Sequence, residues 1–197
     1  RISDDLTYNN TDKMGRTPYA INHQSITAID ESPIVKGVLY AGTDDGRVWG
    51  RKSVNGNWNQ LMKGIPQNAH VSRLVASKYD PATVYLTLSN RREDDHKPYI
   101  FKSTDYGENW QPISGNLPNA PVNVVREDPK NKTILYCGTD LGVYVSKDGG
   151  KTWHSIQANL PATISVQDLF IHPRDNDLVI ATYGRGVWVM DDISPIQ

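Results

Sequence analysis

Short runs of alternating apolar and polar residues recur along the chain, separated by turns rich in Gly, Pro, Asn and Asp. An apolar run leads into a proline at Pro33, Pro81, Pro129 and Pro173, so the pattern repeats at spacings of 48, 48 and 44 residues. After each proline a second run enters a polar turn and a third run leaves it, which in the second repeat is expected to begin at Tyr99. In three repeats a fourth run begins at a tryptophan and ends at a proline, from Trp58 to Pro66, Trp110 to Pro118 and Trp153 to Pro161. Alternation with a period of two predicts β-strands, and this repeat length is typical of four-stranded propeller blades. We therefore predict an all-β chain, a β-propeller fragment of antiparallel four-stranded blades.

The repeat also predicts the domain organisation. One propeller domain is expected to contain three whole blades at residues 25–66, 71–118 and 121–161, a partial last blade at 164–192, and a preceding tail with a linker at 1–24. The residues Ile2–Leu6 match Ile113–Leu117, which ends the second blade, so the chain is expected to open inside an outer strand. Missing blades of the same propeller are therefore the first expected partners. A closed ring of four blades, completed by residues 1–6, is the alternative.

Composition excludes several classes of protein. The 21 Lys and Arg residues nearly balance 22 Asp and Glu, which argues against a nucleic-acid partner. No apolar run approaches 18 residues, so no membrane insertion is expected. The single Cys137 excludes an internal disulfide, and the five histidines lack metal-ligand spacing. We expect neither a metal nor a cofactor.

The most specific motif lies between the third and fourth strands of two repeats. Ser103–Trp110 and Ser146–Trp153 both fit Ser-x-Asp-x-Gly-x-(Thr/Asn)-Trp. The carboxylate can accept backbone N–H groups, the glycine permits a positive φ, and the tryptophan can anchor the outer strand. We therefore predict structural rather than catalytic roles for Ser103, Asp105, Gly107, Trp110, Ser146, Asp148, Gly150 and Trp153.

These octets resemble the Asp-box of BNR repeats, which occur in sialidases, sortilin-type receptors and the twin-propeller glycosidases that cleave xyloglucan. The chain is most similar to exported bacterial BNR-repeat or sortilin-like "glycosyl hydrolases", whose last blade ends much like Gly184–Pro195. The resemblance implies a periplasmic, cell-surface or extracellular location. It does not fix an activity, because the motif specifies the architecture and sites vary independently of it.

In propellers of this kind, ligands usually meet the face formed by the turns between second and third strands. The resemblance places the segment Arg91–His96, the one long loop of the repeat, on that face, together with residues of the shorter turns and of one link between blades. The expected ligand or partner residues are Arg47, His70, Arg91, Arg92, Asp94, Asp95, Tyr183 and Arg185.

Three aspartates are candidate catalysts. Xyloglucan-cleaving relatives carry a catalytic aspartate in an Asp-x-Gly turn, and Asp44, Asp45 and Asp140 lie in such turns here. The alternative is that Thr-Asp-x-Gly is simply a favourable hairpin turn. A glycosidase also needs two carboxylates about 5 Å apart for retention or roughly 6.5–9.5 Å apart for inversion.

No complete catalytic set is visible in the sequence. The preferred hypothesis is a binding or scaffold portion of an exported BNR-repeat propeller, which engages a protein, peptide or glycan through its loop face. The alternative is a glycoside hydrolase of the twin-propeller type that uses channel-facing aspartates. The sequence leaves enzymatic activity open between them.

Overall fold

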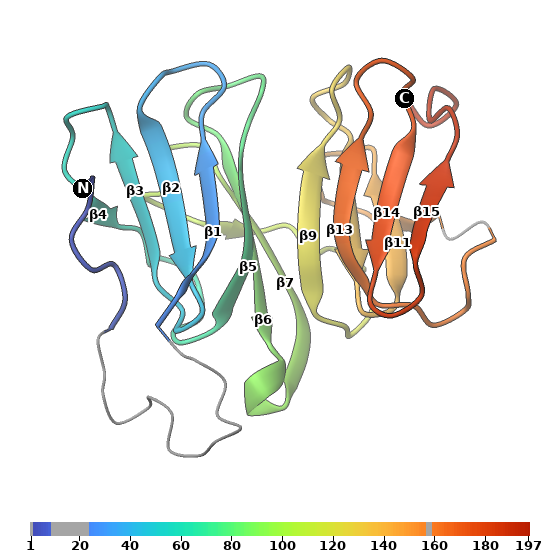
Figure 1. Ribbon diagram of the computed structural model, residues 1–197, viewed down its shortest axis with the longest axis horizontal. Helices are drawn as coiled ribbons and strands as arrows, with labels where there is room; N and C mark the ends of the chain where they lie inside the picture. The colour runs from blue at the N-terminus through green and yellow to red at the C-terminus, as the bar shows by residue number, and fades with distance from the viewer. Residues whose placement is uncertain (1, 9–23, 157–158) are drawn as a thin grey trace. The chain divides into compact units, whose positions relative to one another are not determined.

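The computed structural model describes residues 2–8, 24–156 and 159–197 (Figure 1). Within these ranges the chain is built from antiparallel β-strands, as predicted, with one 3-10 turn, η2 (Arg91–Glu93). The predicted linker at residues 9–23 lies outside the described residues.

The strands form four sheets, each ordered as in the sequence. The first sheet contains β1 (Ile26–Glu31), β2 (Val38–Thr43), β3 (Val48–Lys52) and β4 (Asn59–Gln60). The second contains β5 (His70–Ala76), β6 (Val84–Asn90), β7 (Asp95–Ser103) and β8 (Gln111–Pro112). The third contains β9 (Val122–Glu127), β10 (Leu135–Thr139), β11 (Gly142–Ser146) and β12 (His154–Ser155). The fourth has three strands among the described residues, β13 (Val166–Ile171), β14 (Leu178–Thr182) and β15 (Val187–Met190).

The chain divides into two compact units. The first unit comprises residues 1–86 and 102–111, and the second comprises residues 87–101 and 112–197. The second sheet contributes residues to both units. Because each sheet falls within one sequence repeat, the strands agree with the repeat pattern, whereas the blade boundaries themselves stay a prediction.

Close packing between successive sheets depends on one glycine of the repeat. In the second unit, a Cβ on Gly138 of β10 would lie 2.5 Å from a methyl carbon of Val166 in β13. In the first unit, a Cβ on Gly42 of β2 would lie 2.2 Å from a methyl carbon of Val71 in β5. Such separations are too short for a real Cβ, so glycine lets the valine of the next sheet approach the backbone.

The outer strands are shorter than the predicted runs from Trp58 to Pro66 and from Trp110 to Pro118. Strands β4 and β8 contain only two residues each. Beyond β4, the backbone carbonyls of Leu61 and Lys63 accept hydrogen bonds from the indole and backbone N–H groups of Trp110, at 2.9 and 3.2 Å. These carbonyls therefore bond the following repeat instead of extending the ladder.

The charged segment of the second repeat is more regular than a loop. Residues 91–93 form the 3-10 turn, Asp94 adopts a left-handed conformation with φ 57°, and β7 begins at Asp95. The hydroxyl of Tyr99 donates to Asp95 at 2.6 Å, and the backbone N–H of Lys97 donates to the same carboxylate at 3.1 Å. Both bonds lie within β7, which begins four residues before the strand that the sequence predicted to begin at Tyr99.

No helical segment in the described ranges has the length and apolar character needed to cross a bilayer.

Candidate functional site

The turn between β2 and β3 carries Asp44 and Asp45, two of the candidate catalysts. Asp44 is only 5% exposed, and its Oδ1 accepts the backbone N–H groups of Gln24 and Ser25 at 2.6 and 2.8 Å. Asp45 accepts a hydrogen bond from the Thr43 hydroxyl and another from the backbone N–H of Tyr8 at 2.7 Å. Both carboxylates therefore hold chain segments that precede the first sheet.

Arg47 follows this turn and lies against aromatic rings. Its guanidinium carbon is 3.7 Å from the centroid of the Tyr8 ring and 5.8 Å from that of Trp49, distances suited to cation–π contacts. His70, predicted on a link between blades, is instead the half-buried first residue of β5.

The third candidate catalyst, Asp140, lies at the centre of a polar group in the second unit. One carboxylate oxygen accepts from the Asn123 amide at 2.9 Å and the Ser165 hydroxyl at 2.6 Å. The other oxygen is 3.0 Å from an Arg91 nitrogen. The Gln167 amide donates to Ser165 at 2.7 Å. We refer to these five residues, Asp140, Asn123, Ser165, Arg91 and Gln167, as the turn-end cluster.

The neighbours of Arg91 do not all join the cluster. Arg92 and Asp94 are exposed, and the Asp94 carboxylate lies 3.3 Å from the ring of His96. The Tyr99 hydrogen bond, together with the Lys97 N–H, lowers the pKa of Asp95 below its usual value. Of the four candidates in this segment, only Arg91 is placed beside Asp140.

The turn between β14 and β15 presents Tyr183 and Arg185 to solvent. The Tyr183 side chain is 78% exposed, and its backbone N–H donates to the Ser165 carbonyl at 2.9 Å. Tyr183 is therefore tied through the backbone to the turn-end cluster. Arg185 is also exposed, and its carbonyl accepts from the Trp188 indole at 3.0 Å.

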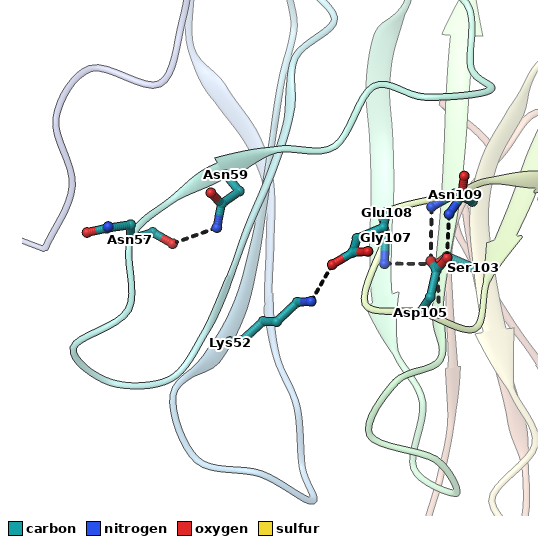
Figure 2. Close-up of polar contacts among 8 residues, drawn as sticks. All are labelled: Lys52, Asn57, Asn59, Ser103, Asp105, Gly107, Glu108 and Asn109. Carbon is teal, nitrogen blue, oxygen red and sulfur yellow. Dashed lines mark hydrogen bonds and ion pairs between the residues drawn. The ribbon is translucent and has the colours of Figure 1, made fainter.

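The two Asp-box turns have the same hydrogen-bond pattern. In the first, the Ser103 hydroxyl donates to Asp105 at 2.7 Å and accepts the Gly107 N–H at 2.8 Å, while Asn109 donates to Asp105 through its backbone and its side chain (Figure 2). The Asn109 amide, followed by the Ser103 hydroxyl, lowers the pKa of Asp105 to about 2.

In the second turn, Ser146, Asp148, Gly150 and Thr152 make the corresponding bonds. The Thr152 hydroxyl is the largest cause that lowers the pKa of Asp148. Both carboxylates are stabilised as acceptors of local donors, an arrangement that closes a turn. The structural role of these residues stays a prediction.

Two cavities lie in the first unit. One, of about 380 Å³, is lined by residues of β2, β3 and β4 and by Tyr106 and Glu108 of the first Asp-box turn. The other, of about 620 Å³, is lined by Ile2–Asp4, Trp49 and the segment Gly56–Trp58. Each has one carboxylate among its lining residues, Glu108 in the first and Asp4 in the second. Neither presents the pair of carboxylates that glycoside hydrolysis needs.

Sequence reasoning missed part of this arrangement. It named Asp140 and Arg91 but omitted their partners Asn123, Ser165 and Gln167, because none belongs to a recognisable motif. The repeat held the signal, since Asn123 corresponds to Thr27 of the first sheet and both reach across to the next sheet. Thr27 donates to the carbonyl of Val71 at 2.7 Å, and Asn123 donates to that of Val166 at 3.0 Å. No three His, Cys, Asp or Glu side chains in the described ranges gather as a metal would require.

Comparison with known sequences supports the resemblance to sortilin-like BNR propellers. The family model described as sortilin, neurotensin receptor 3, matches residues 98–192. A xyloglucanase from Hypocrea jecorina is 28% identical over 142 residues, which cover 64% of this chain and 17% of the relative. An oligoxyloglucan-reducing end-specific xyloglucanase from Emericella nidulans is 26% identical over 185 residues, covering 85% of this chain and 23% of the relative. The chain thus matches about a fifth of the length of these curated relatives.

Comparison with solved structures confirms the fold. The GH74 xyloglucanase from Xanthomonas campestris superposes with a TM-score of 0.66 at 15% identity, covering 92% of this chain and 31% of that one. An ancestral GH74 enzyme gives a TM-score of 0.65 at 18% identity over 81% of this chain and 22% of that one. The YCF48 protein from Cyanidioschyzon merolae gives 0.52 at 19% identity over 84% of this chain and 56% of that one. The chain is a β-propeller fragment, and residues 98–192 are similar to the sortilin family model.

Proposed function

We propose that the chain is a glycan-binding portion of an exported β-propeller, and that its binding surface is the turn-end cluster with the adjacent Tyr183. The observation that carries this proposal is the set of hydrogen bonds and the ion pair that Asp140 makes. Its two oxygens are held by Asn123, Ser165 and Arg91, at 2.6 to 3.0 Å. A carboxylate held this way positions its neighbours.

The exposed groups around Asp140 suit a polar, uncharged ligand. Arg91 is about half exposed and its charge is compensated by Asp140, while the Gln167 amide offers both a donor and an acceptor. Tyr183 adds an exposed aromatic ring that can lie flat against a sugar ring. Loops on a rigid scaffold commonly carry binding residues. The sequence leaves a protein, a peptide or a glycan as the ligand. The similarity to enzymes named xyloglucanases favours a glycan.

The test is a titration of the whole chain with soluble xyloglucan, in which affinity electrophoresis or calorimetry measures binding. Tyr183→Ala is expected to weaken binding at least tenfold, because the ring is exposed and supports no packing. Tyr79→Ala is the matched control, since Tyr79 is an exposed tyrosine on the β5–β6 turn, and it should leave binding unchanged. Absence of binding, or equal binding by Tyr183→Ala, would contradict the proposal.

The second candidate is a glycoside hydrolase, favoured by the same two relatives. Its catalytic carboxylates would be Asp44, Asp45 or Asp140, each of which is hydrogen-bonded within the fold. Release of reducing ends from xyloglucan, measured with the whole chain, separates the two functions. We expect no release. Release that is lost in Asp44→Asn or Asp140→Asn, with folding intact, would favour the hydrolase.

A further blade is the protein partner that we infer for the fourth sheet. In the first and third sheets, the face that carries Gly42 or Gly138 is covered by β5 or β13 of the next sheet. On the fourth sheet, the corresponding face carries the exposed side chains of Phe170, Val187 and Val189. The match to a fraction of longer relatives is consistent with this partner.

Export is part of the proposal and rests on comparison alone. One structural neighbour is described as the extracellular domain of a one-component system from B. thetaiotaomicron, with a TM-score of 0.62 at 18% identity. Fractionation of cells that express the full-length protein tests the location.

A further inference from the structure

Residues 2–6 occupy the position of an outer strand, although they belong to no sheet of the described ranges. The carbonyl of Ile2 accepts the indole N–H of Trp58 at 2.9 Å. Ile113, which the sequence aligns with Ile2, accepts the indole N–H of Trp153 in the same way at 2.8 Å. The segment therefore has the place and the bond of an outer strand, but no third strand lies beside it in the described part of the chain.

The fourth sheet has the opposite deficiency, because β15 ends it and no outer strand follows among the described residues (Figure 1). In the first sheet, the N–H of Leu61 on the outer segment donates to the carbonyl of Val48 at 2.8 Å. In the third sheet, Ile156 donates to Val143 at 3.0 Å. Val187 holds the position of Val48 and Val143 in the fourth sheet. Its carbonyl is therefore the acceptor that an outer strand would use.

Two isoleucines of β1 are exposed at positions that are buried in the fourth sheet. In strand pairing, Ile26 holds the position of Val166 and Ile29 holds that of Leu169. Val166 and Leu169 are fully buried, whereas Ile26 is 51% exposed and Ile29 is 62% exposed. Val166 is covered by the preceding sheet, where it packs on Gly138. The first sheet therefore lacks the cover that a preceding sheet gives the fourth.

The other face of the fourth sheet is also uncovered. Phe170, Val187 and Val189 are 55–68% exposed there. On the third sheet, β13 covers the corresponding face at Gly138. Ala181 takes the place of that glycine, so a covering side chain meets a methyl group rather than bare backbone. Exposed apolar side chains that gather on one face indicate a protein interface.

We propose that a second copy of this chain supplies the further blade that covers the fourth sheet, so the proposal rests on that blade. Residues 2–6 of the second copy pair with β15, and the N–H of its Ile2 donates to the carbonyl of Val187. Its Ile26 and Ile29 cover the exposed face of the fourth sheet. One contact thus completes the three-stranded sheet and buries both apolar faces. A single chain leaves these side chains exposed, so their cover comes from outside it.

Size-exclusion chromatography with light scattering tests the association of the whole chain. We expect the mass of a dimer or of a larger assembly, because a contact between two different surfaces is head-to-tail and can repeat. Ile29→Glu and Val187→Glu should each return the chain to a monomer, since each places a charge in the contact. Ile34→Glu is the matched control and should leave the assembly intact, because Ile34 is exposed on the β1–β2 turn outside both faces.

Two results of this measurement overturn the proposal. One is a monomer at every concentration up to about 100 μM. The other is an assembly that Ile29→Glu and Val187→Glu leave intact.

A disulfide locates the contact. Ile2→Cys and Val187→Cys are made in separate chains, which are mixed and oxidised. Residues directly opposite each other on antiparallel strands lie within reach of a disulfide, and Cys137 is buried and does not compete. A linked pair of chains that forms only in the mixture supports the proposal, and absence of the link overturns it. A doubly substituted chain that closes its disulfide within a monomer also overturns it, because residues 2–6 then complete their own fourth sheet.

The outcomes separate this proposal from the proposed function. A monomeric chain overturns the second copy but leaves the further blade to another part of a longer polypeptide. Ile29→Glu should bind xyloglucan as the unchanged chain does, whereas Tyr183→Ala should keep the assembly. An assembly that binds no xyloglucan overturns the glycan surface alone.

Discussion

The indole N–H of Trp153 donates to the backbone carbonyl of Ile113 at 2.8 Å. Ile113 follows the outer strand of the preceding repeat, three residues after Trp110. Trp110 bonds Leu61 in the same way at 2.9 Å, and Trp58 bonds Ile2 at 2.9 Å. In three repeats, the tryptophan that ends the Asp-box or the corresponding turn thus bonds a segment that precedes the repeat. The bond from Trp58 also places Ile2 where an outer strand of a preceding repeat would lie.

Trp153→Phe should destabilise the second unit by about 1–3 kcal/mol, because it keeps an aromatic ring but removes the pyrrole part of the indole, and with it buried volume and the donor for the Ile113 carbonyl. Trp58→Phe is the matched control, since its ring is only half buried and its bond to Ile2 is exposed. Urea denaturation monitored by circular dichroism measures both. An equal loss of unfolding free energy in the two variants would show that burial does not strengthen the hydrogen bond of Trp153.

Gly138→Ala should destabilise the chain by about 1–3 kcal/mol, because the added methyl group overlaps the side chains of Val166 and Val124. Val166→Ala alone should also be destabilising because it leaves a cavity. In the double variant the two changes offset each other, so its loss of stability should be smaller than the sum of the single losses. A double-mutant cycle by chemical denaturation measures this coupling. Strict additivity would contradict direct packing of Val166 on Gly138.

The depressed pKa of Asp105 predicts an acid-dependent contribution to stability. An unfolded aspartate titrates near pH 3.9, whereas Asp105 titrates near pH 2 in the folded chain. The unfolded chain therefore takes up a proton first as the pH falls. The contribution is complete above about pH 4–5 and is lost between about pH 4 and pH 2.

Asp105→Asn should flatten the dependence of unfolding free energy on pH across this range, because the variant has no proton to take up. Denaturant titrations at successive pH values between 6 and 2 measure the slope. Asp191→Asn, at an exposed aspartate outside both Asp-box turns, is the control and should leave the slope unchanged. Identical slopes in Asp105→Asn and the unchanged protein would show that Asp105 is not linked to folding.

Local pattern was sufficient for the strands and for the sheet order. Alternating apolar and polar residues, together with turn residues, located the runs of the repeat. The shared octet located both Asp-box turns. The pattern failed where backbone groups bond a different repeat. The outer runs after Trp58 and Trp110 contain only two strand residues each, because the next carbonyls bond across to a neighbouring tryptophan. In the charged segment, β7 begins at Asp95, four residues before the predicted start at Tyr99.

For the candidate site, sequence reasoning could name chemically able residues but could not tell which were already engaged. Asp44 and Asp140 lie in turns that suit both a catalyst and a hairpin. Their roles depend on donors that lie 17 to 49 residues away along the chain and belong to no motif, such as Ser25 for Asp44 and Ser165 for Asp140. These contacts are long-range, so only the folded chain specifies them.

The sequence by itself determined the all-β class, the repeat and the turn chemistry, because alternation and turn preferences act over a few neighbouring residues. Only the tertiary structure decided which polar groups are satisfied. Tyr40 and Tyr136 look alike in the sequence, but Ser32 leaves the Tyr40 hydroxyl without a partner in the described part of the chain, while Asp128 accepts a hydrogen bond from the Tyr136 hydroxyl. Whether a buried polar group finds a hydrogen-bond partner depends on residues that the pairing of distant strands brings together.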